Sequence, residues 1–96
     1  MKYKLIRLQS NEMVIAEVSM EDEEFIYLQE PFALVPTNDG KLNFIPWCPL
    51  NEEGTPVQVY KKNIVYYAIP NEDVTNNYKE IFSNIITPPS SGKIIT

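Results

Sequence analysis

Four consecutive acidic residues are the densest set of groups in this sequence that could do chemistry. Glu21, Asp22, Glu23 and Glu24 could attract a hard cation such as calcium through their carboxylate oxygens. A calcium-binding loop, however, spaces its ligands along the chain and turns at a glycine, and this run has neither feature. The run therefore predicts a solvated acidic loop and no metal site.

The residue types that usually carry catalysis are scarce. The sequence has no histidine, which removes the commonest general base and metal ligand near neutral pH. Cys48 is the only cysteine, and without a histidine we expect it to be a buried, inert thiol. The three glycines, Gly40, Gly54 and Gly92, are too scattered to cradle a phosphate group. The sequence predicts a protein that is not an enzyme and binds no cofactor.

Composition limits the partners and the compartment. The 96 residues are 44% apolar and 22% charged, as expected for one folded domain. Thirteen acidic and eight basic residues give a net charge of −5, which disfavours loose binding to phosphates but allows a local basic patch. A lone cysteine suits a reducing compartment. We expect no secretory signal and no membrane span, because apolar runs of roughly 20 residues are missing.

Periodicity predicts the elements that must position any site. Alternating apolar residues and β-branched runs predict five short strands, at residues 3–9, 13–20, 25–28 (continued, bent, through 32–35), 57–60 and 64–69. Turn signals separate them, among them Asp39-Gly40. We therefore expect a mainly β fold, a small and strongly bent antiparallel sheet or partly open barrel.

The pattern changes to a helix after Pro70. Asn71 is a suitable N-cap, and Glu72 and Asp73 complement the positive end of a helix. Apolar residues recur at helical spacing through Val74, Tyr78, Ile81 or Phe82, and Ile85. The sequence predicts an amphipathic helix over residues 71–86 that can cover the open end of the barrel. Residues 1–86 then form the domain, and 87–96 a flexible tail.

Two short motifs resemble those of Sm-like (LSm) proteins. The run from Val59 to Tyr66, VYKKNIVY, is similar to the family's second motif, Ile-Arg-Gly-Asp-Asn-Val-Val-Tyr. Residues 20–28 align without a gap on the first motif, Phe-Asp-x-x-Met-Asn-Leu-x-Leu, with Ile26 and Leu28 as close matches. The chain looks most like the divergent Sm-like proteins of phages, including cyanophages. The family usually carries its helix before the first strand, whereas this helix follows the last.

The resemblance implies a five-stranded Sm-like barrel that assembles into a ring through its last two strands. Unpaired strand edges invite association, and amphipathic tyrosines suit an interface. The expected interface residues are Val57, Val59, Tyr60, Ile64, Val65, Tyr66 and Tyr67. Alternatively, the tyrosines complete the core of a monomer. The implied compartment is the cytoplasm of a bacterial or phage-infected cell.

In the family, uracil-rich RNA is held by residues of both motifs. Carried over by position, these fall on Glu21, Phe25, Tyr60 and Lys61, and none of the four is identical to the family residue. Phe25 and Tyr60 could stack on bases, and Lys61 and Lys62 could meet phosphate. The competing interpretation is a structural or adaptor oligomer that binds a protein partner, for which the acidic balance suits a basic partner.

Overall fold

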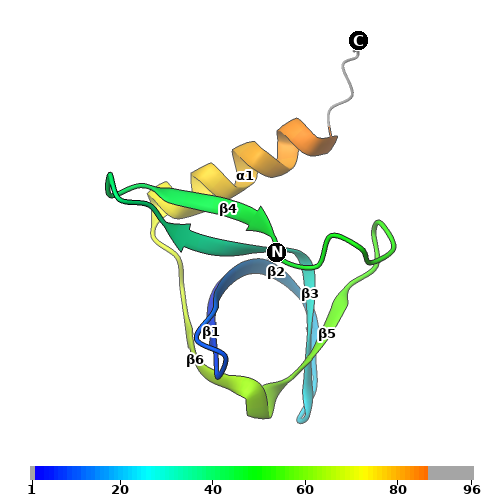
Figure 1. Cartoon of the computed structure of the whole chain (residues 1–96). Coiled ribbons are helices and arrows are strands. Elements are labelled where there is room, and N and C mark those ends of the chain that lie inside the picture. Colours follow the sequence, from blue (N-terminus) through cyan, green and yellow to red (C-terminus); the bar gives the residue numbers. More distant parts are fainter. Residues whose placement is uncertain (1, 87–96) are drawn as a thin grey trace.

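A computed structural model describes the backbone of residues 2–86 and the side chains of residues 3–81. The expected tail at 87–96 lies outside the described residues. The described elements are six strands, one short 3-10 helix and one α-helix (Figure 1). Their bounds are β1 Lys2–Leu8, β2 Met13–Glu21, β3 Phe25–Pro36, β4 Leu42–Pro46, β5 Val57–Tyr60, η1 Lys61–Asn63, β6 Ile64–Ala68 and α1 Glu72–Ile86.

The strands form one antiparallel sheet, so the predicted mainly β class is confirmed. Its order is β4-β3-β2-β1-β6, and β5 pairs separately with β3. The sheet has six strands where five were expected, because Leu42–Pro46 adds a hairpin to the second half of β3. The barrel is not closed: β5 pairs with β3 and β6 with β1, but no pairing joins β5 to β6 in the described chain.

Strand β3 is long enough to serve both halves of the sheet because it bends in the middle. Glu30 has a φ of 49°, in the left-handed region that only a few per cent of non-glycine residues adopt. The pairing of β3 with β2 slips at this point, so that β3 holds an extra residue between Gln29 and Phe32. Before the bend β3 pairs with β5, and after it with β4.

The first half of strand β2 is covered on both faces, which explains why it begins with the continuous apolar run Met13-Val14-Ile15-Ala16. Val14 and Ala16 face the interior of the open barrel, together with residues of β1, β3 and β5. Ile15 faces the other way, toward α1. Farther along, the register with β3 slips again between Val18 and Met20. This slip explains why Met20, expected on the same face as Val14, is 54% exposed.

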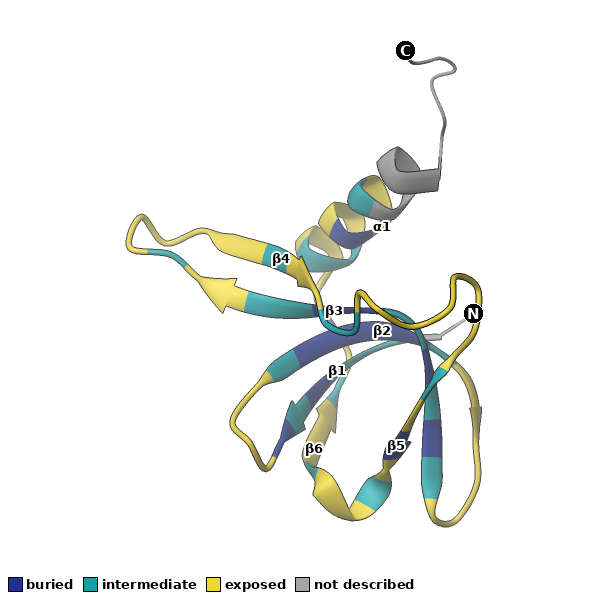
Figure 2. Cartoon of the chain, turned by 45° about the vertical axis from the view of Figure 1, so that its right-hand side comes forward, coloured by how far each residue is buried: buried dark blue, intermediate teal, exposed yellow. Residues whose placement is uncertain are grey.

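Helix α1 begins where the capping signal predicts. The side-chain oxygen of Asn71 accepts a hydrogen bond of 2.9 Å from the amide of Val74, as an N-cap does. The helix packs on the outer face of the sheet, against Ile15 and Phe32 (Figures 1 and 2). The expectation that it covers the open end of the barrel was therefore wrong. Its anchor is Tyr78, whose side chain is fully buried.

Candidate functional site

The basic hinge between β5 and β6 is a single turn of 3-10 helix, η1, held from both sides. The amide of Lys61 donates to the carbonyl oxygen of Glu24 at 2.9 Å, which ties the hinge to the β2–β3 loop. The backbone amide of Gln9 donates to the carbonyl oxygen of Asn63 at 2.8 Å, and the side-chain Nε2 of Gln9 donates to the main-chain carbonyl oxygen of Lys62 at 3.0 Å. The hinge therefore has a fixed position beside the acidic loop.

The acidic loop uses its own carboxylates to shape its backbone. The Oδ1 atom of Asp22 accepts hydrogen bonds from the amides of Phe25, at 2.8 Å, and Glu24, at 2.9 Å. These two bonds, the Phe25 bond foremost, hold the pKa of Asp22 below its ordinary value. Asp22 thus positions Phe25 at the start of β3. Among the described residues, no three potential metal-ligating side chains lie together.

An aromatic pair occupies the outer face of the sheet next to the hinge. Phe25 and Tyr60 are opposite each other in the β3–β5 ladder, and their ring centroids lie 4.6 Å apart with planes tilted by 43°. The ammonium group of Lys62 lies 5.1 Å from the centroid of the Tyr60 ring, within the range of a cation–π interaction. Tyr27 extends the aromatic surface, 6.5 Å from Phe25, and accepts a hydrogen bond from Gln58.

Ion pairs join the end of β2 to β1 and to the hinge beside this surface. Glu21 accepts from Lys61 at 2.7 Å and lies 3.5 Å from Lys4. The hydrogen bond from Lys61, reinforced by both positive charges, lowers the pKa of Glu21, and the same bond raises the pKa of Lys61. Lys4 also lies over the Tyr67 ring, 4.5 Å from its centroid, and burial raises the pKa of that phenol. The positive charge of Lys61 is therefore partly compensated by the carboxylate of Glu21, whereas Lys62 belongs to neither ion pair.

The structure brings all five residues expected to bind RNA to one end of the molecule. Glu21 and Lys61 form an ion pair, and Phe25, Tyr60 and Lys62 form a continuous aromatic and basic surface. The sequence reasoning missed Tyr27, although the two-residue period of a strand places it on the same face as Phe25. It also missed Lys4, which is opposite Ala16 in the β1–β2 ladder and still reaches Glu21, an approach that no local sequence signal indicates.

The seven residues expected at an oligomer interface divide into two groups. The side chain of Val59 is buried inside the barrel of its own chain, and those of Val57 and Ile64 are partly buried against the same core. The other four side chains are exposed: Tyr60 by 44%, Val65 by 59%, Tyr66 by 44% and Tyr67 by 39%. Figure 2 shows this exposure along β6.

The exposure of Cys48, the search for a membrane-spanning helix and the comparisons with known proteins complete the description of the site. The thiol of Cys48 is half-buried, where a buried thiol was expected. In the described part of the chain, no helix has the length and apolar character needed to cross a bilayer. Neither the models of known protein families nor the curated protein sequences contain a match to this chain.

Proposed function

We propose that this protein is a non-enzymatic, Sm-like subunit of a homo-oligomeric ring that binds single-stranded RNA in the cytoplasm of a bacterial or phage-infected cell. The observation that carries the proposal is the surface formed by Phe25, Tyr60 and Lys62, where two edge strands meet at the hinge. A stacking platform beside a cation is the usual way to hold unpaired bases without reading their sequence.

The edges of β5 and β6 support the oligomeric part of the proposal. Each strand has one partner in the described chain, β3 for β5 and β1 for β6, which leaves the second edge of each strand unpaired there. Unpaired edges are templates for another strand, and β6 adds the exposed side chains of Val65, Tyr66 and Tyr67. Pairing β5 of one subunit with β6 of the next would repeat the Phe25–Tyr60 surface around a ring.

Electrostatics limit the RNA affinity that we expect. Lys61 is engaged by Glu21, so a phosphate must compete with a carboxylate for it. Glu23 and Glu24 lie on the same loop and add negative charge that a ring repeats in each subunit. Stacking on the two rings must therefore supply most of the binding, at about 1–3 kcal/mol per base.

A second candidate function is an adaptor ring that binds a basic protein. The pairing of Glu21 with both Lys4 and Lys61, next to exposed carboxylates of the same loop, favours it. In this case the acidic loop is the contact surface, and the net charge of −5 attracts the partner.

Three measurements test these proposals. Light scattering gives the solution mass, for which we expect a multiple of at least five subunits; a strict monomer would remove the ring. Fluorescence anisotropy with labelled oligo-U at low salt tests RNA binding, and absence of binding into the tens of micromolar would end that part. A pull-down from host lysate, with and without nuclease, separates the candidates, because partners bridged by RNA disappear on digestion.

A further inference from the structure

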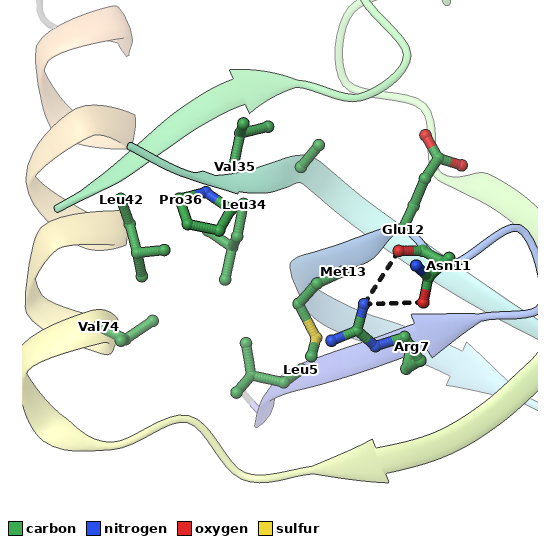
Figure 3. A pocket seen from close by; sticks show the side chains of 11 residues that line it. Leu5, Arg7, Asn11, Glu12, Met13, Leu34, Val35, Pro36, Leu42 and Val74 are labelled. Carbon is green, nitrogen blue, oxygen red and sulfur yellow. Dashed lines mark hydrogen bonds between the residues drawn. The ribbon is translucent and has the colours of Figure 1, made fainter. Parts of the chain in front are cut away.

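A second concave surface lies on the outer face of the sheet, which α1 only partly covers. It runs from the β1–β2 turn, which Gln9 joins to the hinge, to the first turn of α1. Tyr78 fills the space over Ile15 and Phe32, but the first turn of the helix leaves a groove next to Val74. The groove has a volume of about 620 Å³, within the range of about 300–1,000 Å³ typical of small-molecule sites. Figure 3 shows the side chains that line it.

Most of the groove is apolar and open at its rim. Leu5, Met13, Leu34 and Val74 form its wall, contributed by β1, β2, β3 and α1. Leu42 on β4 borders it and is 41% exposed, as is Val35. Burial of these side chains under an apolar chain would remove them from water, which is favourable in proportion to the area covered.

One end of the groove is polar and carries a positive charge. Arg7, the only arginine of the sequence, donates from Nη1 to the carbonyl oxygen of Asn11 at 2.9 Å and lies 3.4 Å from its Oδ1 (Figure 3). These contacts fix the guanidinium of Arg7 at the polar end of the groove, and its other N–H groups can donate to a ligand. Both ion pairs found among the described residues centre on Glu21, and neither uses Arg7.

A carboxylate also lies near this end, but it has its own partners. Glu12 lines the groove, and its two oxygens accept from the Ser10 hydroxyl at 2.9 Å and from the Trp47 indole at 3.3 Å. These hydrogen bonds hold Glu12 in the β1–β2 turn. Arg7 belongs to no ion pair with Glu12 or any other carboxylate among the described residues.

From the apolar wall and the single cation at its end, we infer that the groove binds a linear hydrocarbon chain that ends in a carboxylate. The carboxylate accepts from the guanidinium of Arg7, which presents donors in a fork that matches two carboxylate oxygens. The hydrocarbon chain lies along Leu5, Leu34 and Val74, toward the rim at Leu42. This ligand site is separate from the aromatic surface at the hinge and does not depend on the proposed function.

Calorimetric titration of the full chain with hexanoate, octanoate and decanoate, each below its micelle concentration, tests the inference. We expect binding to tighten by about threefold to fourfold for each methylene added, the equivalent of about 0.8 kcal/mol, until the groove is full. Octanol serves as the matched neutral ligand, and we expect it to bind at least tenfold more weakly than octanoate. Equal binding of the two, or no dependence on chain length, would overturn the inference.

Two variants assign the contacts. Arg7→Gln should abolish the preference for octanoate over octanol, and Arg7→Lys should retain part of it. Leu42→Phe should weaken decanoate binding by narrowing the rim, whereas Leu50→Phe, at a residue that is 97% exposed and outside the groove, should not. Unchanged octanoate binding in Arg7→Gln would contradict the assignment. So would a fall in solution mass when decanoate is added, because a second copy of the chain would then be the occupant of the groove.

Discussion

The hydroxyl of Tyr78 donates a 2.7 Å hydrogen bond to the main-chain carbonyl oxygen of Glu30, at the point where β3 bends. The carbonyl oxygen of Gln29 lies 3.3 Å from the same hydroxyl. The ring of Tyr78 meets Phe32 and Tyr3 edge to face, with centroids 5.9 and 5.6 Å away. The helix thus holds the bend that lets one strand pair with both β4 and β5, and through β5 it supports the hinge surface.

Tyr78→Phe should destabilise the protein by about 1–2 kcal/mol, because carbonyl groups at the bend lose a buried donor. The pKa of Tyr78 is raised by burial, so the wild-type hydroxyl keeps its proton at all ordinary pH values. Urea unfolding followed by circular dichroism measures the loss. Tyr66→Phe, at a phenol that is 44% exposed, is the control and should be nearly neutral. Equal stabilities of the two variants would show that the hydrogen bond contributes little.

Glu30→Val should destabilise the protein although valine favours strands. Glu30 has a φ of 49°, and a β-branched side chain in the left-handed region is strained, at a cost of about 1–2 kcal/mol. Glu30→Gly loses the same charge but adopts this conformation freely, so it should be neutral or stabilising. The order of unfolding midpoints in urea, glycine above valine, is the expected result. The reverse order would mean that ordinary strand propensity governs this position.

Local signals predicted much of the fold. The Asn71 cap and the period of Val74 and Tyr78 placed the helix within one residue of its observed start, because capping and amphipathicity are encoded by neighbours in sequence. Alignment to two motifs predicted that Phe25 and Tyr60 belong to one site, and the two residues are opposite each other in the β3–β5 ladder. These features depend on short stretches of the chain.

The features that the sequence did not predict depend on tertiary context. Glu30 is neither glycine nor asparagine, so nothing in its neighbourhood predicts a positive φ; the bend is stabilised by Tyr78, which is 48 residues away. The covered face of β2 was also missed, since Ile15 can point toward a helix only if the helix packs on the outside of the sheet. The ion pair of Lys4 with Glu21 likewise joins residues that lie 17 positions apart in the sequence.

Glu21→Gln should change the pH dependence of stability in a defined direction. The pKa of Glu21 is lowered in the folded protein, mainly by the hydrogen bond from Lys61, so its contribution is present above the unfolded value of 4.5 and is lost as the pH falls through the folded value. The melting temperature of wild type should exceed that of Glu21→Gln near neutral pH. The difference between the two melting temperatures should shrink as the pH falls below 4.5. Glu23→Gln, on the same loop, is the charge-matched control. A difference that persists in acid would exclude the ion pair as its cause.

Val65→Asp should dissociate the proposed ring. Val65 is the extra residue of a bulge in β6, because Arg7 pairs with Tyr66 and Leu8 with Ile64. Its side chain is 59% exposed, so a carboxylate there costs the single chain little but would be buried beside a neighbouring strand. Light scattering should show a smaller mass, with the strand signal in circular dichroism retained. Leu50→Asp, at a fully solvated loop position, should leave the mass unchanged. An unaltered mass for Val65→Asp would mean that β6 is not the interface.

Phe25 and Tyr60 should contribute to RNA binding as a unit. Each alanine substitution should cost about 1–3 kcal/mol of binding free energy, since each removes a ring on which a base can stack. Because the rings lie 4.6 Å apart, removal of one also displaces the other, so the double variant should lose less than the sum of the single losses. Tyr60→Phe keeps the ring and should bind oligo-U nearly as wild type. Strict additivity in anisotropy titrations, or equal losses in Tyr60→Phe and Tyr60→Ala, would show that the two rings do not form a common stacking surface.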